Sequence, residues 1–292
     1  MNLVIDGNNN LYRAYYKFTG YKSFDGEPTG CTYGFVMMTL GLLRKFKPKE
    51  VYVALDSGRS PYRLKIHPDY KAKRENKISF DAEAFYAQRD TLIKLLPLMG
   101  IPVIYHKGHR VEGDDIVYSL RKKFITKPFT IISRDKDFNQ LINKNTSVYD
   151  SKDQILYTHK NITQRLGYKA SQLVDYLTLL GDDSDNIPGY RGMGEKRSIE
   201  FLQKFQYISR FLDSNDTFST IDKKVLKELA EKNKKLIDLR THHKEFNYGL
   251  DITHFNHTPP DLEKAKKILH RLDIKLLTKE ENISLIKQFI KQ

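Results

Sequence analysis

Short apolar runs alternate with longer segments of helical periodicity over the first half of the chain. The apolar runs have the length of buried strands and lie at residues 2–5, 51–55, 101–105 and 129–132. The segments with apolar residues at the spacing of one helix face are 9–16, 30–46, 83–99 and 114–124. Strands that alternate with helices predict an α/β fold with a doubly wound, mostly parallel sheet. We expect residues 146–157 to add an antiparallel hairpin at one edge.

The second half of the chain has helical periodicity almost throughout. Helices are expected at about 159–166, 170–180, 194–204 and 222–240, with one or two more after Pro260. We therefore predict an α/β part over residues 1–170 and a helical part over residues 171–292.

Composition narrows the class of protein. The 292 residues are 39% hydrophobic and 29% charged, which is typical of a globular chain and excludes a disordered one. No run is apolar for long enough to predict a transmembrane helix. Cys31 is the only cysteine, which excludes an intramolecular disulfide and a cysteine-ligated zinc site. Because the first segment, MNLVIDGNNN, also lacks the features of a signal peptide, we expect a cytoplasmic protein.

The charge of the chain favours a polyanionic partner. There are 50 lysines and arginines against 36 acidic residues, a net charge of +14, and the pI is near 9.5. Cationic side chains that bind phosphates release counterions, so this excess suits nucleic-acid binding. A basic enzyme without such a partner would have the same composition, so charge alone does not decide.

The long connection at residues 57–82 lies between a predicted strand and a predicted helix. Connections of this length are uncommon and often carry function. Between Arg59 and Lys77 it has seven basic and two acidic residues, with Tyr62 and Tyr70 among them. Basic residues interleaved with aromatic ones are typical of a path for a nucleic-acid strand. A solvated loop or a charged helix face is the alternative interpretation.

Acidic residues follow each of the four predicted strands. They are Asp6, Asp56, the group Glu112, Asp114 and Asp115, and the pair Asp135 and Asp137. Parallel strands of an open sheet end at one edge, where ligands bind, so these side chains should converge. Gathered carboxylates repel one another, so either their pKa values rise or cations bind among them. Oxygen ligands without Cys or His favour Mg²⁺ or Mn²⁺, although single residues of this set could instead cap helices or form turns.

Two further motifs lie between the predicted helices of the second half. In GDDSDNIPG, residues 181–189, Asp182 and Asp185 could ligate a second ion, or the segment could be a polar loop. GYRGMGEKRS, residues 189–198, is not a P-loop, because Glu195 stands where that motif requires Lys. We predict a glycine hairpin that opens a helix at about Glu195, whose free N–H groups could contact a phosphate. A tight helix–helix turn is the alternative.

Five motifs occur in the order and at the separations typical of one known family. They are VIDGNNNLYRAYY, ALDSGRSPYRLKIHPDYKAKR, VEGDDI, SRDKDFNQL and GDDSDNIPGYRGMGEKRS, and they span about residues 3–205. In these motifs the chain resembles the 5′-nuclease family, which includes stand-alone flap endonucleases of phages and bacteria and the 5′-nuclease domain of bacterial DNA polymerase I. The resemblance implies a structure-specific 5′-nuclease of DNA replication and repair. Such an enzyme hydrolyses phosphodiester bonds of DNA at 5′ ends and 5′ flaps by a two-metal mechanism.

The resemblance assigns the acidic residues to two metal sites. The first would consist of Asp56, Glu112, Asp114 and Asp135, with Asp6 and Asp115 in support. The second would consist of Asp137, Asp182 and Asp185, with Asp135 nearby. Two or more Mg²⁺ ions are implied, for which Mn²⁺ could substitute. The rest of the molecule would then form a basic surface around an acidic active site.

The resemblance also gives functions to the connection at residues 57–82, which we call the basic connection, and to the glycine hairpin. Residues 57–82 match a helical arch, at whose base the family places a stacking aromatic residue and cations that face the scissile phosphate. The aromatic is Tyr70, the cations are Lys71 and Arg74, which would be catalytic together with Asp135, and Lys73 stands where the family usually has Asn. A helix–three-turn–helix at about 181–205, where the family often holds K⁺, would bind duplex DNA through Gly192, Gly194, Lys196 and Arg197. Arg13 matches a basic residue that contacts DNA.

The implied partners are branched or 5′-ended double-stranded DNA, with RNA–DNA primers as a further candidate. We expect a monomer without a protein partner or membrane association. Two alternatives stay open: a structure-specific nucleic-acid binding protein with weak or absent catalysis, and a ribonuclease of the related fold. A Rossmann dinucleotide enzyme is disfavoured, because no G-x-G-x-x-G follows the first strand.

Overall fold

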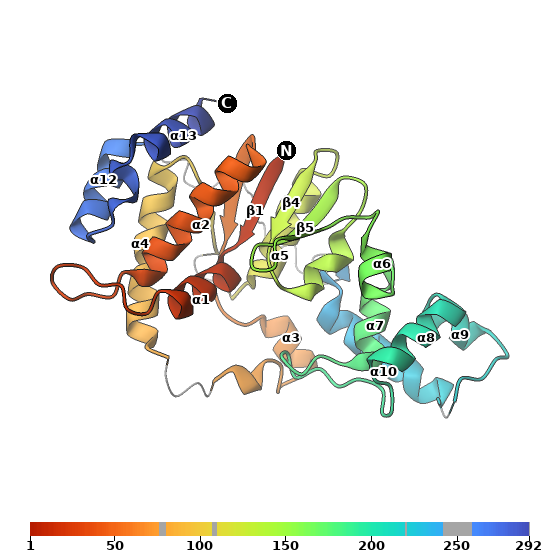
Figure 1. The fold of residues 1–292 in the computed structure, drawn as a ribbon. Helices are drawn as coiled ribbons and strands as arrows, with labels where there is room; N and C mark the ends of the chain where they lie inside the picture. Colours follow the sequence, from red (N-terminus) through yellow and green to blue (C-terminus); the bar gives the residue numbers. More distant parts are fainter. Residues whose placement is uncertain (76–79, 107–109, 220, 242–258, 292) are drawn as a thin grey trace.

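A six-stranded sheet lies at the centre of the computed structural model, which describes residues 1–75, 80–106, 110–219, 221–241 and 259–291 (Figure 1). The strands, in the order β3-β2-β1-β4-β5-β6, are β1 (Asn2–Asp6), β2 (Glu50–Ala54), β3 (Val103–Ile104), β4 (Phe129–Ile132), β5 (Thr146–Asp150) and β6 (Ile155–Tyr157). Neighbouring strands are parallel from β3 to β5, and β6 pairs antiparallel with β5. The predicted mostly parallel sheet and the hairpin at its edge are confirmed.

The strand order reverses on the two sides of β1. From β1 the chain moves outward to β2 and β3, and then places β4 and β5 on the other side. The register pairs Asp6 with Ala54 and Ile5 with Ile132, so β1, β2 and β4 end at about the same level. The segments that leave β1 and β4 diverge at this carboxyl edge, which is where open α/β sheets bind ligands.

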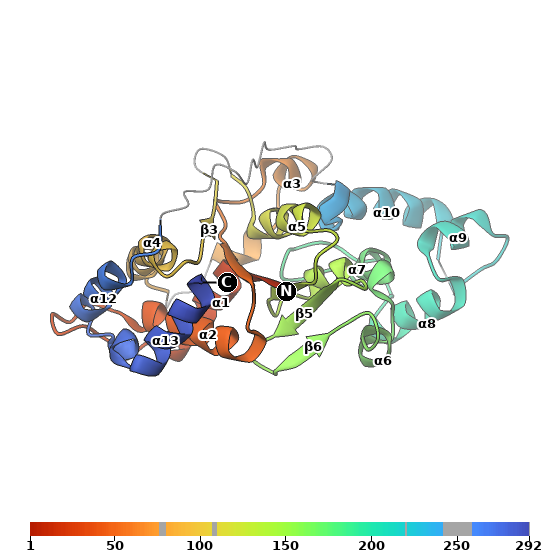
Figure 2. The same ribbon diagram turned by 90° about the horizontal axis from the view of Figure 1, so that it is seen from above.

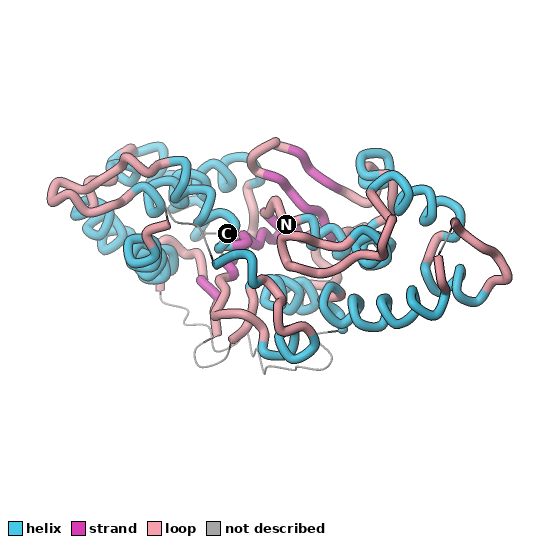
Figure 3. Tube along the Cα trace, turned by 90° about the horizontal axis from the view of Figure 1, so that it is seen from below, coloured by secondary structure: helices cyan, strands magenta, loops and turns pink. Residues whose placement is uncertain are grey.

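Helices cover both faces of the sheet, so the fold is doubly wound (Figures 2 and 3). The covering elements are α1 (Gly7–Lys17), α2 (Gly30–Phe46), α4 (Ala82–Leu98), α5 (Gly113–Lys123) and the 3₁₀ helix η2 (Lys136–Leu141). Leu3 and Ile5 of β1 are buried in the core with α1, α2 and α4, whereas Val4 is buried with α5 and η2. Alternate residues of one strand thus reach opposite cores, which explains its unbroken apolar run.

Helices α7 to α10 form a second unit beside the sheet, which we call the helical lobe (Figure 1). After α6 (Ile162–Leu166) and the 3₁₀ helix η3 (Ala170–Gln172) come α7 (Leu173–Leu180), α8 (Glu195–Phe205), α9 (Ile208–Asp213) and α10 (Lys223–Ile237). Their apolar faces meet in one core, where Phe201, Phe205 and Phe211 are in ring contact. The lobe therefore has a core separate from the two cores of the sheet, and Tyr70 of the basic connection also packs into it.

The last helices do not join the helical lobe. The sequence predicts one helical part over residues 171–292, but α12 (Leu262–Arg271), the 3₁₀ helix η5 (Lys275–Thr278) and α13 (Glu280–Ile290) lie on the sheet side (Figure 2). There Ala265, Leu269 and Ile286 are buried in the core that contains α2 and α4. Both helices are amphipathic, and their apolar stripes cover the outside of this helix layer.

The basic connection contains α3 (Pro61–Ile66), a short helix that the periodicity did not predict. Ser60 caps it, with a hydroxyl that accepts a hydrogen bond from the Arg63 N–H at 3.4 Å. The 3₁₀ helix η1 (Ala72–Glu75) follows. Residues 76–79 of the predicted arch lie outside the described residues. Within the described parts of the chain, no helix has both the length and the apolar content needed to cross a membrane.

Candidate active site

Asp6 is the last residue of β1, and Asp135 lies shortly after β4. These are the two adjacent strands from which the chain continues in opposite directions across the sheet. Asp6 ends β1 and caps α1, where its Oδ1 accepts a hydrogen bond from the Asn9 N–H at 3.2 Å. Its Oδ2 accepts from the Ser133 hydroxyl at 2.6 Å. The oxygen of that hydroxyl accepts from the Asp135 N–H at 2.9 Å, and Asp135 in turn caps η2. Ser133 therefore ties the end of β1 to the end of β4.

Asp56 and Asp114 complete this first acidic group. Asp56 follows β2, and its carboxylate accepts from the Asn8 side-chain amide at 2.6 Å and from the Gly113 N–H at 2.5 Å. A Cβ at position 113 would lie 2.7 Å from Asp56 Oδ1, so this close approach requires glycine. Asp114 is the next residue, in the first turn of α5.

Burial and repulsion raise the pKa of two members of the first acidic group. Burial is the largest cause for Asp6; the hydrogen bond from Ser133 opposes it, the charges of the neighbouring carboxylates add to it, and the pKa rises to about 7. Burial also raises the pKa of Asp114 well above its ordinary value, and the charge of Lys71 only partly offsets three neighbouring carboxylates. The group thus has more negative charge than the surrounding protein compensates.

A second acidic group adjoins the first and consists of Asp137 in η2 with Asp182 and Asp185 in the loop after α7. Asp182 is compensated, because its Oδ1 accepts from the Ser184 N–H and hydroxyl at 2.9 and 2.7 Å and its Oδ2 lies 3.2 Å from Lys136 Nζ. Burial alone would raise its pKa, but these contacts lower it.

Asp137 is compensated less, because burial and neighbouring carboxylates outweigh the charge of Lys136, which lowers its pKa. Its Oδ1 is buried and has no hydrogen-bond partner among the described residues. Burial, followed by the charges of Asp135, Asp185 and Asp182, raises its pKa well above the ordinary value. Asp135 lies between the two acidic groups, because its N–H donates to the Ser133 hydroxyl that binds Asp6 and its Oδ1 accepts from the Asp137 N–H at 2.9 Å.

Glu112, at the start of α5, is surrounded by donors. Its Oε1 accepts from the Ser60 N–H at 3.0 Å. Its Oε2 accepts from Arg63 Nη1 and Lys71 Nζ, each at 2.9 Å, and from the Tyr70 hydroxyl at 3.1 Å. Burial would raise the pKa of Glu112, but the charges of Lys71 and Arg63 outweigh it and lower the pKa.

Asp115 pairs with Arg63 and is buried with it. The Arg63 guanidinium donates from Nη2 to Asp115 Oδ1 and from Nη1 to Asp115 Oδ2, both at 3.0 Å. The resemblance places Asp115 beside Asp56 and Asp114. Successive residues of a helix point about 100° apart, and in the structure the Asp115 carboxylate binds Arg63 of α3.

Tyr70 and Lys71 are covered, with only 2% and 8% of their surface exposed. The Tyr70 hydroxyl donates to Asp185 Oδ2 at 3.2 Å as well as to Glu112. Lys71 Nζ lies 3.7 Å from Asp185 Oδ2, and its backbone has a left-handed φ of 57°. Both side chains therefore bridge α5 and the second acidic group, whereas the resemblance implies that they face a DNA strand.

The other predicted DNA contacts of this region are more open. Lys73 is exposed, with its Nζ 3.5 Å from Asp183 Oδ1. Arg13 is half-buried and donates from Nη2 to the Ser151 carbonyl at 3.2 Å, in the turn after β5. The side chain of Arg74 lies outside the described residues.

The predicted glycine hairpin precedes α8, which begins at Glu195 as expected. Gly192 has a φ of 82°, in the region that favours glycine. Gly194 is the N-cap at φ −83°, and a Cβ there would meet no atom within 4 Å. Lys196 is exposed, whereas Arg197 Nη1 donates to the Gly192 carbonyl at 2.9 Å and so closes the hairpin.

Several residues that organise the site were not predicted. Asn8 and Ser133 stand beside Asp6 and Asp135 in the motifs DGNNN and SRDKD, so small polar neighbours of a strand-end aspartate are a usable signal. Arg63 gives no such signal, because it is one of many basic residues in its segment.

The residues of the two acidic groups fit hard divalent cations, although their present spacing is open. No three His, Cys, Asp or Glu side chains of the described chain lie close enough together to enclose one ion. The donors are nevertheless all carboxylate oxygens, which Mg²⁺ and Mn²⁺ prefer. The buried, unpartnered Asp137 Oδ1 and the raised pKa of Asp114 are what a site built for added positive charge would have.

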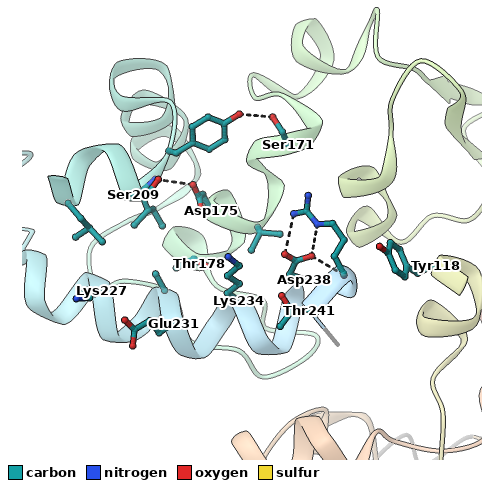
Figure 4. Close-up of a pocket in the computed structure, with 16 residues that line it drawn as sticks. Tyr118, Ser171, Asp175, Thr178, Ser209, Lys227, Glu231, Lys234, Asp238 and Thr241 are labelled. Atoms are coloured by element: carbon teal, nitrogen blue, oxygen red, sulfur yellow. Dashed lines mark hydrogen bonds and ion pairs between the residues drawn. The ribbon is translucent and has the colours of Figure 1, made fainter. Parts of the chain in front are cut away.

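A separate cavity of about 700 Å³ lies between α7, α9 and α10 (Figure 4). Arg240 donates two hydrogen bonds to Asp238 at its wall, at 2.8 and 3.2 Å. None of the carboxylates of the two acidic groups lines it, so the cavity is not the candidate active site.

Comparison with known proteins identifies relatives along the whole chain. Residues 1–167 match the family model "5′-3′ exonuclease, N-terminal resolvase-like domain", and residues 168–263 match "5′-3′ exonuclease, C-terminal SAM fold". A 5′-3′ exonuclease of Aquifex aeolicus is 31% identical over 95% of this chain and 93% of its own. DNA polymerase I of Caldicellulosiruptor bescii is also 31% identical, but the chain spans only 34% of its length.

Solved structures share the fold at low sequence identity. The T5 D15 protein co-crystallised with metal ions is 22% identical, with a TM-score of 0.69 over 93% of this chain and 99% of that chain. Flap endonuclease-1 from Methanococcus jannaschii is 19% identical, with a TM-score of 0.59 over 99% and 92% of the two chains. These similarities agree with the predicted fold class.

In EDTA, Asp6→Asn should gain stability relative to the parent protein as the pH rises. The unfolded carboxyl ionises near pH 3.8, whereas the folded pKa is about 7, so the folded parent binds the extra proton between these values. Raising the pH through this window therefore costs the parent up to about 1.4 kcal/mol per pH unit, and the loss is complete above the folded pKa. The Tm difference between variant and parent should be smallest near pH 4 and largest near pH 7.5. Equal differences at both pH values would contradict the raised pKa.

Proposed function

Because this chain belongs to the 5′-3′ exonuclease family, we propose that it is a structure-specific 5′-nuclease that cuts DNA at 5′ ends and 5′ flaps. Family and fold make the chain a 5′-nuclease; the cleavage position and the roles of single residues are the proposal. The observation that supports it best is the juxtaposition of two acidic groups at the carboxyl edge of the sheet, with Lys71 beside them. Phosphodiester hydrolysis needs both metal-binding oxygens and a cation near the phosphate.

We assign divalent ions to the two acidic groups, with Asp135 between them. Asp6, Asp56 and Asp114 would hold one ion, and Asp137, Asp182 and Asp185 the other. Glu112, which the resemblance also assigns to the first site, binds Arg63 and Lys71 in the structure. When bound, Mg²⁺, or Mn²⁺ in its place, supplies an activated water and charge for the leaving oxygen. The T5 D15 protein with metal ions and the T5 5′-exonuclease with zinc support a divalent requirement.

Lys71 is the proposed catalytic cation, with Arg74 beside it. In the structure the Lys71 ammonium lies on Glu112. We propose that it exchanges this carboxylate for the scissile phosphate and stabilises the charge that develops there. Tyr70, which is covered here, would stack on a base once that exchange opens the base of the arch. The products would have a 5′-phosphate and a 3′-hydroxyl.

The helical lobe would hold the duplex through the open N-terminus of α8. Gly192, Gly194 and Lys196 present backbone N–H groups and one ammonium there, with K⁺ as a candidate ion in the turn. Arg13, Lys73 and Arg197 would add phosphate contacts. A T5 flap endonuclease has been solved in complex with DNA, which supports a DNA substrate. We further propose that the protein is a cytoplasmic monomer of DNA replication and repair, with RNA–DNA primers among its substrates.

An assay on 5′-flap, nicked and single-stranded DNA, with Mg²⁺ or EDTA, tests the function. We expect Mg²⁺-dependent release of a 5′ label from the flap substrate, and Asp135→Asn should lower the rate by several orders of magnitude because this residue serves both ions. Binding in Ca²⁺ should survive, since it depends on the basic surface. Binding without cleavage would favour a nucleic-acid binding protein, and preferential cleavage of RNA flaps a ribonuclease.

Lys71→Ala should lower the single-turnover rate about 100- to 1000-fold, as loss of a preorganised group facing the transition state does. Lys65, exposed on α3 in the same basic connection, provides the control. Lys65→Ala should weaken flap binding slightly, lower the salt dependence by about one phosphate contact, and leave the rate nearly unchanged. Equal, small effects of both substitutions would mean that Lys71 is not catalytic and that this segment only attracts DNA through its charge.

Gly194→Ala should weaken flap-duplex binding at only a small cost in stability, since alanine is a poorer N-cap than glycine. The position has an ordinary φ and open space for a Cβ, so only a ligand backbone that approaches closely would meet the added methyl group. Gly41→Ala on α2 is the control, because its Cβ also has open space, far from the lobe. An unchanged dissociation constant would mean that the hairpin is only a turn.

A further inference from the structure

Arg63 of α3 is one of the most deeply buried side chains, with 2% of its surface exposed. Its Nη1 donates to Glu112 Oε2 at 2.9 Å, and the two Nη groups bind Asp115 at 3.0 Å each. Its Nε donates to the Leu236 carbonyl at 3.1 Å. One guanidinium therefore joins the basic connection, the start of α5 and the end of α10.

This arrangement is more specific than stability alone requires. A buried ion pair seldom stabilises a fold more than apolar side chains of similar volume, because both charges lose hydration. What the planar guanidinium adds is direction, since its donors form a fork that matches a carboxylate in one orientation only. Asp115 fixes two of these donors and so fixes the plane in which Arg63 meets Glu112.

The orientation of Arg63 bears directly on Lys71. Both cations donate to the same oxygen, Glu112 Oε2, which the Tyr70 hydroxyl also contacts. A shift of the guanidinium would move this oxygen or free it to bind Lys71 more tightly. The distance of the Lys71 ammonium from the first acidic group thus depends on a residue that does not itself face that group.

We propose that Arg63 and Asp115 are a positioning pair for Lys71, and that Asp115 acts on Arg63 and not on a metal ion. The inference rests on the proposed nuclease function and revises the role that the resemblance implies for Asp115. The pair fixes the position of Glu112, the carboxylate that Lys71 would leave when it binds the phosphate. Because it acts through Lys71, its effect should vanish when Lys71 is absent.

Asp115→Asn tests the pair, since asparagine keeps the shape and one acceptor oxygen but loses the charge that orients the fork. Arg63→Met is less suitable, because it would leave a buried carboxylate unpaired and could unfold the protein. Asp238→Asn is the matched control: Asp238 is also a buried aspartate that accepts two hydrogen bonds from a guanidinium, that of Arg240, but at the separate cavity. Each variant is made with and without Lys71→Ala.

Three quantities are measured: Mn²⁺ affinity without DNA by calorimetry, flap-DNA affinity in Ca²⁺, and the single-turnover rate in Mg²⁺. We expect Asp115→Asn to lower the rate at least about tenfold, to leave both affinities within about twofold, and to have less than about a twofold effect in the Lys71→Ala background. Asp238→Asn should match the parent throughout.

Two results would overturn the inference. A tenfold or greater loss of Mn²⁺ affinity in Asp115→Asn would make Asp115 a metal ligand, and an equal rate loss with and without Lys71 would make the pair merely structural. If the parent and Asp238→Asn themselves failed to cleave the flap, the proposed function would be wrong instead, and the same assay distinguishes this outcome.

Discussion

Repulsion between carboxylates is the constraint on which the rest of this structure depends. Parallel strands that end at one level, with an aspartate after each, concentrate negative charge at a single edge of the sheet. The surrounding structure supplies donors to that edge from nearly every direction: the Ser133 hydroxyl, the Gly113 N–H, the Asn8 amide and the Lys136 ammonium. Asp137 and Asp114 keep raised pKa values despite these donors, so this edge of the sheet retains negative charge that bound cations would neutralise.

Hydrogen bonds to backbone carbonyls join the basic connection to the loop of the second acidic group. The Lys71 N–H donates to the Asp185 carbonyl at 3.0 Å, the His67 ring contacts the Asn186 carbonyl at 2.7 Å, and the Asn186 amide donates to the Asp69 carbonyl at 3.0 Å. The base of the predicted arch and the loop of the second acidic group are therefore tied together by backbone as well as by side chains. Whatever moves one of them must move the other.

Much of the fold and part of the site could be predicted from the sequence. The ends of β1 and β2 are marked by apolar runs that an aspartate follows, and α2 begins and ends where its periodicity does. The direction in which Asp115 points could not be predicted, because it depends on whether α5 begins one residue earlier or later. Nor could the partner of Arg63, since a carboxylate 52 residues away in the chain leaves no local pattern. The position of α12 was missed for a related reason: an amphipathic stripe shows that a helix is buried on one side, but not which core receives it.

The return of α12 and α13 to the sheet has a consequence for the order in which the chain can fold. The core of the helical lobe is built from α7 to α10 together with Tyr70 of the basic connection, so all of its parts have left the ribosome before α12 is synthesised. The layer of α2 and α4 is synthesised much earlier, yet it acquires Leu269 and Ile286 only after the lobe has been completed. During synthesis the apolar outer surface of this layer stays uncovered while the lobe folds. The helices synthesised last, α12 and α13, therefore cover helices that were among the first to be synthesised.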